Sequence, residues 1–413
     1  MLTASQGPLW DAYDVAMLDL DGVVYIGPDA VPGAPEHLDA AREAGMHLAY
    51  VTNNASRTPA TVARHLRDLG IAVADEDVVT SAQAAARVLS EMLPDGSAVF
   101  VIGGEGLEVA LGEQGLRPVQ DPEEKPAAVV SGFHGDLRWS TVIAGAILVR
   151  DGLPWVASNT DMTVPTPAGP GPGNGALVEV VARFSGRRPV VAGKPESPLF
   201  EETLRRVGGE RPLVVGDRLD TDIEGANNTG YDSLLVMTGV TGLDQLVAAG
   251  PALRPSYVAA DLGGLGRRHD EPATDGDTVS AGGWSATVVD GAVRVTGDGD
   301  GADAWWQAVA TAAWRHLDTT GDVAGDLGGL GRPHAEPEVD GDTVRTGGWR
   351  AVVRDGRLTV DGDGDADAWW QAVATAGWRH LDATAEPVAV EGLTAPGSVG
   401  ADPDEQDEKR DRP

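Results

Sequence analysis

Short apolar runs alternate with longer amphipathic segments along the first 260 residues of the chain. Residues 15–18 are all apolar, which predicts a short strand buried on both faces. Further along, Val62, Leu66 and Leu69 recur at the spacing that places them on one face of a helix. Strands that alternate with helices in this way predict a parallel sheet covered by helices.

The alternation restarts near residue 98, which predicts a second α/β unit inserted into the first. Its expected strands and helices lie at residues 99–102, 107–114, 127–130, 141–150 and 155–157. Residues 163–175 are rich in Pro and Gly and predict a loop, and the first sheet is expected to resume at residue 190. The predicted fold class is α/β, with a doubly wound parallel-sheet (Rossmann-like) core and an inserted α/β cap domain.

The last third of the chain contains an internal repeat. Residues 261–267 recur as residues 326–332, and the Trp-rich segment that follows is also repeated. Each copy predicts a hairpin followed by a helix, because a turn such as Asp290-Gly291 separates two alternating strands. This region is therefore expected to be a duplicated small α+β unit, with its paired tryptophans in the core.

These patterns predict six segments along the chain. The segments are a core formed by residues 1–82 and 190–260, a cap formed by residues 83–189, repeats at residues 261–320 and 321–384, and an acidic tail at residues 385–413. The tail is rich in Pro, Gly and charged residues, a composition that predicts disorder.

Composition narrows the classes of function. The 413-residue chain has a formal net charge of -33, which argues against a nucleic acid or an anionic membrane as partner. It has no cysteine, which excludes disulfides, thiol catalysis and Cys-based zinc sites. We find neither an apolar run long enough to span a bilayer nor the pattern of a signal peptide. We therefore expect a cytoplasmic protein.

Polar residues follow the predicted core strands or precede the predicted core helices. They form four groups: Asp19 and Asp21; Thr52, Asn53 and Asn54; Lys194; and Asp217, Asp220 and Asp222. The carboxyl ends of parallel strands meet at one edge of a sheet, so these groups are expected to converge. Carboxylates as close in sequence as Asp19 and Asp21 repel each other unless a cation lies between them. Such a set predicts a metal-dependent site for phosphoryl transfer.

The four groups resemble the four motifs of the haloacid dehalogenase superfamily. The motifs are Asp19-Leu-Asp21-Gly-Val, Thr52-Asn-Asn54, Gly193-Lys194-Pro195 and Gly216-Asp-Arg-Leu-Asp-Thr-Asp222-Ile. Their order and spacing match the branch that contains phosphoglycolate and 4-nitrophenyl phosphatases, which carries a large α/β cap. The resemblance covers roughly residues 10–260, and details such as Pro172-Gly-Asn-Gly175 are most like actinobacterial glycerol-3-phosphate phosphatases.

This resemblance implies a catalytic role for each matching acid. Asp19 would attack phosphorus and become a phospho-aspartate, while Asp21 would protonate the leaving alkoxide and then deprotonate the attacking water. Mg²⁺ would be held by the Asp19 carboxylate, the Asp21 backbone carbonyl and Asp217, with Asp222 orienting its waters. Asp220 is left open between a site residue and a surface acid.

The resemblance also implies the groups that bind the phosphate. Thr52, the amide of Asn53, and Asn54 would hold the phosphoryl oxygens, and Lys194 would offset the negative charge shared by nucleophile and phosphate. The physical need is clear, because two unit charges 4 Å apart repel by about 4 kcal/mol at an effective dielectric of 20.

The function implied is a Mg²⁺-dependent phosphatase of a small phosphorylated metabolite, with glycerol 3-phosphate first and 2-phosphoglycolate second. Two alternatives remain: a phosphomutase or phosphotransferase of the same superfamily, and a binding or scaffolding protein that acts through the Trp-rich repeats. Residues 161–175 of the cap are expected to read the leaving group, and a homodimer through the cap is one arrangement open to the chain. Deletion of everything after residue 260 is expected to leave hydrolysis measurable.

Overall fold

The computed structural model describes residues 2–166, 169–299, 301–324, 338–340, 343–346, 349–354 and 357–362. The chain divides into two compact units, Met1–Leu327 and Gly328–Pro413. The predicted core, cap and first repeat all fall in the first unit.

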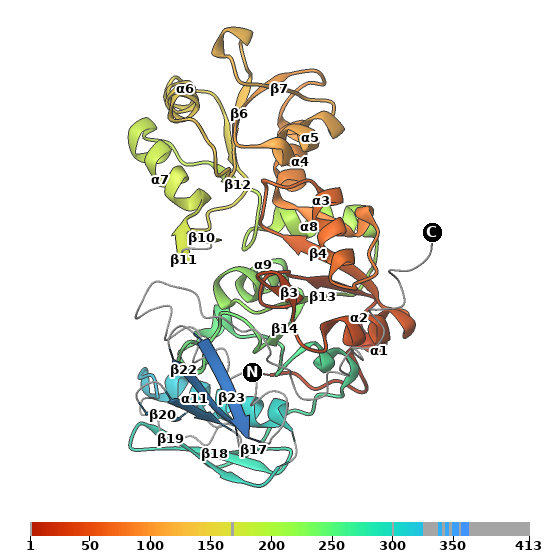
Figure 1. Ribbon diagram of the computed structural model, residues 1–413, viewed down its shortest axis with the longest axis vertical. Helices are drawn as coiled ribbons and strands as arrows, with labels where there is room; N and C mark the ends of the chain where they lie inside the picture. Colours follow the sequence, from red (N-terminus) through yellow and green to blue (C-terminus); the bar gives the residue numbers. More distant parts are fainter. Residues whose placement is uncertain are drawn as a thin grey trace, which may run out of the picture. The chain divides into compact units, whose positions relative to one another are not determined.

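The core is a six-stranded sheet in which every neighbouring pair of strands is parallel (Figure 1). Strand β1 lies in the middle, between β13 and β4, and the later strands were added on both sides of it. Ligands of such sheets bind beyond the carboxyl ends of the strands at this switch point. In spatial order the strands are β15 Tyr257–Ala259, β14 Asp232–Val236, β13 Pro212–Gly216, β1 Val15–Leu18, β4 His47–Thr52 and β5 Val78–Thr80.

Different helices cover the two faces of the core sheet, because successive strand residues point to opposite sides. Ala16 and Leu18 pack in the cluster that includes α1, α2 and α3, while Val15 and Met17 pack in the cluster that includes α4, α8 and α9. The helix bounds are α1 Leu9–Ala12, α2 Ala34–Glu43, α3 Pro59–Asp68, α4 Ser81–Met92, α8 Ser197–Val207, α9 Glu224–Thr229 and α10 Leu243–Val247. A short ribbon of β2 (Tyr25–Ile26) and β3 (Asp29–Ala30) follows β1.

Helix α4 begins with a reciprocal capping interaction. The Thr80 hydroxyl accepts a hydrogen bond from the Gln83 N–H, and the Gln83 side chain accepts one from the Thr80 N–H. Ser81 is therefore not the cap, although its position at the start of the helix suggests one. Its hydroxyl instead donates to the backbone oxygen of Asn53 at 2.6 Å, which ties this helix to the second motif.

The cap is a second, five-stranded sheet, again with parallel neighbours. Val99 and Val101 face the cluster of α4 and α5, while Phe100 and Ile102 face that of α6 and α7. In spatial order the strands are β12 Val190–Val191, β9 Trp155–Ala157, β8 Ala128–Ser131, β6 Ala98–Ile102 and β7 Arg117–Val119, and the helices are α5 Glu105–Glu113, α6 Trp139–Arg150 and α7 Asn174–Ser185.

The expectation that the first sheet resumes at residue 190 is wrong. Strand β12 pairs with β9 and extends the cap sheet, and the core sheet resumes only at β13. A two-residue apolar run carries no information about which sheet it joins, because pairing is a long-range choice.

The loop expected at residues 163–175 is also wrong. Strands β10 (Thr163–Thr166) and β11 (Gly169–Pro172) form an antiparallel ribbon, and helix α7 begins at Asn174. Proline is compatible with a two-stranded ribbon because each strand has a free edge that needs no N–H donor.

The first repeat is a four-stranded antiparallel sheet and one long helix. The Asp290-Gly291 turn joins two of its strands, and both residues adopt positive φ angles of 53° and 78°, as a tight hairpin requires. The elements are β16 Ala273–Asp275, β17 Thr278–Ala281, β18 Trp284–Val289, β19 Ala292–Gly297 and α11 Ala302–Thr320. Trp305 and Trp314 of this helix are fully buried, whereas Trp306, the second member of the predicted core pair, is only half-buried.

The second unit contains the matching antiparallel sheet of the second repeat. Its strands are β20 Glu338–Asp340, β21 Thr343–Thr346, β22 Trp349–Arg354 and β23 Arg357–Gly362. The predicted helix of this copy and the predicted tail at residues 385–413 lie outside the described residues. Among the helices that the structure describes, none is long and apolar enough to cross a membrane.

Candidate active site

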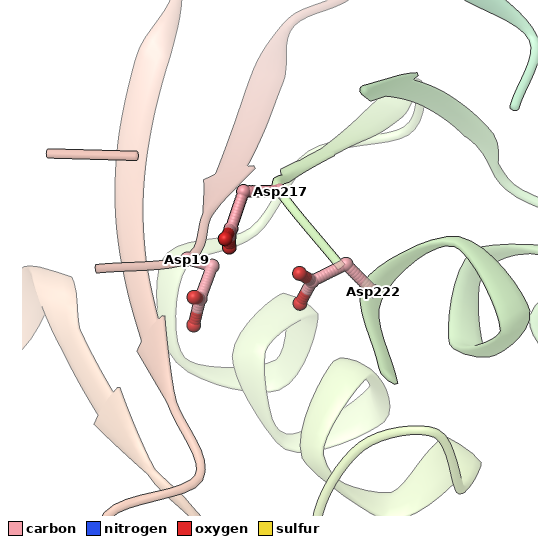
Figure 2. A group of neighbouring side chains, drawn as sticks. All are labelled: Asp19, Asp217 and Asp222. Atoms are coloured by element: carbon pink, nitrogen blue, oxygen red, sulfur yellow. The ribbon is translucent and has the colours of Figure 1, made fainter. Parts of the chain in front are cut away.

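Three acids from two strand ends share one space at the carboxyl edge of the core sheet. Asp19 follows β1, Asp217 follows β13, and Asp222 lies in the helical turn Leu219–Ile223 that comes next. Each carboxylate offers an oxygen that lies within 4.8 Å of the others, and Figure 2 shows the three groups facing one another. The structure therefore brings these three residues together, as expected from the sequence.

Lys194 joins this cluster from the segment that links the cap back to the core. Its Nζ lies 2.5 Å from Asp19 Oδ1 and 2.7 Å from Asp222 Oδ1, and its side chain is only 4% exposed. Burial by itself would lower the pKa of Lys194, but Asp19 and Asp222 outweigh that effect and raise it. The lysine is therefore a fixed positive charge between two acids.

One carboxylate oxygen of Asp217 is buried without a hydrogen-bond partner among the described residues. Its Oδ2 accepts a hydrogen bond from the Val240 N–H at 2.6 Å, while its Oδ1 is buried and has no partner among the described residues. Two glycines make room for this carboxylate, because a Cβ at Gly22 or Gly239 would lie 2.5 or 2.0 Å from Oδ2. A buried acceptor without a donor is costly, so this oxygen fits a metal ligand.

The raised pKa values of the acids indicate that the cluster lacks positive charge. Burial, followed by the charges of Asp222 and Asp19, raises the pKa of Asp217 to about 8. Burial raises the pKa of Asp222 to about 6 even though Lys194 opposes the shift, and it raises the pKa of Asp19 as well. Three carboxylates around one ammonium are two positive charges short of neutrality. A divalent cation with a preference for oxygen ligands fits this donor set.

Asp21 lies at the exposed side of the site. Its carboxylate accepts a hydrogen bond from the Tyr25 hydroxyl at 3.4 Å, and desolvation by the surrounding protein raises its pKa. Its side chain is not one of the three that converge within 4.8 Å. A carboxyl with a raised pKa beside Asp19 is suited to general acid chemistry.

The second motif forms a compact turn after β4. The Thr52 hydroxyl accepts a hydrogen bond from the Asn54 N–H at 3.1 Å, and Asn54 Oδ1 accepts bonds from the Ser56 N–H and hydroxyl at 2.9 and 2.7 Å. The Asn54 side chain therefore shapes the turn. The predicted phosphate contacts of Thr52, Asn53 and Asn54 remain predictions.

Asn53 connects Lys194 to the cap. Its Oδ1 accepts a hydrogen bond from the Lys194 N–H at 2.8 Å, and its Nδ2 donates to the Lys194 carbonyl at 3.0 Å. The Nδ2 group also donates to both carboxylate oxygens of Asp161, at 3.1 and 3.2 Å. This one amide therefore holds the Lys194 backbone on both sides and fixes an acid of the cap next to the site.

Sequence reasoning placed Asp161 only at the start of the cap segment expected to read the leaving group, and it assigned no role to the neighbouring Asn159. Asn159 Nδ2 donates to the Asn53 carbonyl at 2.6 Å, so both residues help to hold the second motif. A usable signal was present, because these residues follow the end of β9 as Asp19 follows β1. The strand-end rule therefore holds for the cap sheet as well as for the core sheet.

Asp220 lies apart from the cluster. Its side chain is 65% exposed and forms a bidentate pair with Arg218, with distances of 3.0 and 2.7 Å. The sequence left Asp220 open between a site residue and a surface acid, and its exposure identifies it as a surface acid.

Comparison with known proteins places this site in a family. A sequence model described as haloacid dehalogenase-like hydrolase matches residues 16–117, and a second, HAD-hydrolase-like model matches residues 191–265. The chain is 41% identical over 310 residues to the D-glycerol 3-phosphate phosphatase of Mycobacterium tuberculosis, which spans 73% of this chain and 86% of that protein. The chain belongs to the haloacid dehalogenase-like hydrolases. The family predicted from the four motifs is thus confirmed.

Other relatives agree in class. The acid sugar phosphatase of Staphylococcus aureus is 36% identical over 252 residues, covering 60% of this chain and 95% of that protein. Among solved structures, the M. tuberculosis glycerol phosphate phosphatase in complex with magnesium matches with a TM-score of 0.69 at 40% identity, over 75% of this chain and 93% of that one. The 4-nitrophenylphosphatase of Thermotoga maritima matches with a TM-score of 0.58 at 31% identity, over 62% and 98%.

These matches confirm the α/β fold class and the assignment of the chain as a phosphoric monoester hydrolase. The predicted Mg²⁺ cofactor agrees with the magnesium complex of the M. tuberculosis relative.

Proposed function

We propose that this hydrolase is a Mg²⁺-dependent phosphatase of glycerol 3-phosphate, with 2-phosphoglycolate as the second candidate substrate. The observation that carries the proposal is the cluster of Asp19, Asp217 and Asp222 around Lys194, with the Asp217 Oδ1 buried and unpartnered. The similarity to the mycobacterial D-glycerol 3-phosphate phosphatase supports the choice of substrate.

In the first step, a carboxylate oxygen of Asp19 attacks phosphorus, and the bond from phosphorus to the leaving oxygen breaks. Asp21 gives its proton to that oxygen, so the alcohol departs neutral. In the second step, Asp21 accepts a proton from a water that attacks phosphorus, and the bond from phosphorus to Asp19 breaks. Lys194 stays charged throughout, because two acids hold its proton.

Asp19, Asp217 and the backbone carbonyl of Asp21 would hold Mg²⁺, and Asp222 would orient its waters. When bound, the ion neutralises charge on the phosphate oxygens and on the surrounding acids. The structural support for this assignment is the donor set itself, since oxygen ligands of this kind suit Mg²⁺.

The leaving group would be read by the cap segment that begins at Asp161. This carboxylate is half-buried, and Asn53 holds it beside the second motif. A fixed carboxylate is a strong acceptor for an alcohol O–H, which suits a substrate whose leaving group carries free hydroxyls. Apart from β12, which joins the cap sheet, the domain bounds given above remain part of this proposal.

A homodimer through the cap is supported by two exposed apolar rows on adjacent helices. Trp139 and Ile143 lie on α6, and Val180 and Phe184 lie on α7, all four at least 44% exposed. Light scattering is expected to give twice the chain mass for the natural sequence and the single mass for Phe184→Glu. A natural-sequence monomer would reject this arrangement. The cytoplasmic location is likewise a proposal, supported by a metabolite substrate.

The test is phosphate release from a panel of phosphorylated metabolites by the purified protein, with and without Mg²⁺. We expect Mg²⁺-dependent release, fastest from glycerol 3-phosphate. Absence of release from every compound would overturn the phosphatase proposal. Transfer of labelled phosphate to a second hydroxyl instead of water would favour the phosphomutase alternative.

A further inference from the structure

The helix of the first repeat, α11, packs directly against the catalytic core. The Trp314 indole N–H donates to the Leu246 carbonyl in α10 at 2.7 Å. Asp318, one turn later, forms a bidentate pair with Arg254 at 2.7 Å for both bonds, and the guanidinium of Arg254 lies over the Trp314 ring, 5.2 Å from its centroid. The first repeat is therefore joined to the part of the chain that carries the site.

The apolar side of this contact belongs to the same buried cluster as the turn that contains Asp222. Trp314 and Ala310 share one buried cluster with Leu219 and Ile223, the first and last residues of the turn that contains Asp222. Trp314 and Ile223 are both completely buried. The packing of Leu219 and Ile223 in this cluster therefore constrains the position of the Asp222 backbone.

A second path leads from the same tryptophan to Asp217. Helix α10, which Trp314 contacts through Leu246, directly follows the loop that holds this acid. In that loop the Val240 N–H donates to Asp217 Oδ2 at 2.6 Å, and the Thr241 N–H donates to the Asp217 carbonyl at 3.1 Å. One side chain therefore supports both acids from outside the site.

Such support is needed because the acids repel one another. Carboxylate oxygens of Asp19, Asp217 and Asp222 lie within 4.8 Å of one another, and charged carboxylates this close favour a wider separation unless a cation lies between them. A close-packed backing resists this movement, whereas a cavity behind the turn would permit it.

We propose that α11 is a positioning element of the metal site, and that Trp314 holds Asp217 and Asp222 at the separation the ion requires. The inference rests on the proposed Mg²⁺ site. Trp314 touches neither the ion nor the substrate, and this role explains why the repeat accompanies the catalytic core.

The same helix supplies a matched control. Trp305 is also completely buried, but it is not a member of the cluster around Leu219 and Ile223; it lies against Trp306, with ring centroids 4.9 Å apart, and Trp306 packs against the edge of that cluster. Replacing either tryptophan removes a similar buried area from α11. The paths to Asp217 and Asp222 start from Trp314.

The experiment uses the full-length chain and the variants Trp314→Ala, Trp314→Phe, Trp305→Ala and Trp305→Phe. Mg²⁺ binding is measured by calorimetry without substrate, the Mg²⁺ dependence of 4-nitrophenyl phosphate hydrolysis is measured in parallel, and melting is followed by circular dichroism. We expect Trp314→Ala to raise the Mg²⁺ Kd about tenfold, the effect typical of an outer-sphere support, and Trp314→Phe to raise it less. Both Trp305 variants should melt earlier but keep the Kd within about twofold.

Equal changes in Kd for the two positions would overturn the inference, and so would Trp314 variants that melt earlier yet bind Mg²⁺ like the natural sequence. The Phe variants keep the comparison possible if an Ala variant does not fold. A natural-sequence protein that neither binds Mg²⁺ nor releases phosphate would overturn the proposed function, and with it this inference. If the natural-sequence protein binds Mg²⁺ and releases phosphate, a failed prediction for the variants would overturn only the inference about Trp314.

Discussion

The carboxyl edge of the core sheet and the cap segment that meets it hold their charged groups in different ways. At the core edge, Asp19 and Asp222 share Lys194, and backbone N–H groups fix Asp217, so each group is constrained by several others. In the cap, Asp161 is held by the side-chain amide of Asn53. The comparison teaches that the acids of the core edge sit in a crowded cluster held by several partners, whereas the Asp161 carboxylate, which we propose to contact the leaving group, is held by one side-chain amide. Changes at the core edge should therefore affect every substrate, and changes in the cap should discriminate between substrates.

The largest expected effect follows replacement of the nucleophile. Asp19→Asn preserves the shape of the side chain but removes the charge that attacks phosphorus, so turnover should fall by on the order of 10⁴ or more for all substrates. The measurement is phosphate release from glycerol 3-phosphate and from 4-nitrophenyl phosphate. Full activity in this variant would refute the assignment of Asp19.

Loss of the acid–base group should be the next largest effect. Asp21→Asn leaves the alcohol without a proton donor, and the expected fall in kcat is about 10²–10⁴ for glycerol 3-phosphate. The fall should be much smaller for 4-nitrophenyl phosphate, because a nitrophenolate leaves without protonation. Equal losses for both substrates would contradict a role as general acid.

A change in the cap should separate the substrates. Asp161→Asn removes one charge-assisted hydrogen bond to the leaving group, so kcat/KM should fall about tenfold for glycerol 3-phosphate. It should change by less than about twofold for 4-nitrophenyl phosphate. Asp136→Asn, an exposed acid elsewhere in the cap, serves as the control and should alter neither value. Equal losses on both substrates would place Asp161 with the reacting groups instead.

The stability of the metal-free protein should depend on pH, because the core edge is short of positive charge. The folded chain keeps a proton on Asp217 up to about pH 8, while the same carboxyl in the unfolded chain loses it near its ordinary pKa of 3.8. Between these values the folded state binds more protons, so rising pH lowers the free energy of unfolding of the metal-free protein. Mg²⁺ binds the deprotonated form, so the rise in Tm on adding Mg²⁺ should be larger at pH 8.5 than at pH 6. A rise that is equal at both pH values, or absent, would contradict the metal site.

The smallest effect is expected at Asp220. This acid forms an exposed pair with Arg218, and such pairs contribute little. Asp220→Asn should leave kcat/KM and the Mg²⁺ half-saturation within about twofold of the natural values. A large loss would show that the site extends further toward the surface than the cluster around Lys194.

The sequence determined the core of this protein and the residues of its site. An apolar run as short as Val15–Leu18 favours a strand buried on both faces, and polar residues directly after parallel strands meet at one edge of the sheet. Asp19, Lys194, Asp217 and Asp222 could therefore be named from local patterns and a family resemblance.

Tertiary structure alone decided which sheet β12 joins, how the Pro-rich segment after Asp161 folds, and where α11 packs. Strand pairing and helix packing depend on partners far away in the sequence, and a short apolar run or a Trp-rich helix fits several of them equally well. The link from Trp314 to Asp222 belongs to this second class, because nothing near either residue in the sequence indicates the other. The chemistry of the site could thus be predicted from the chain, but its support could be seen only in the fold.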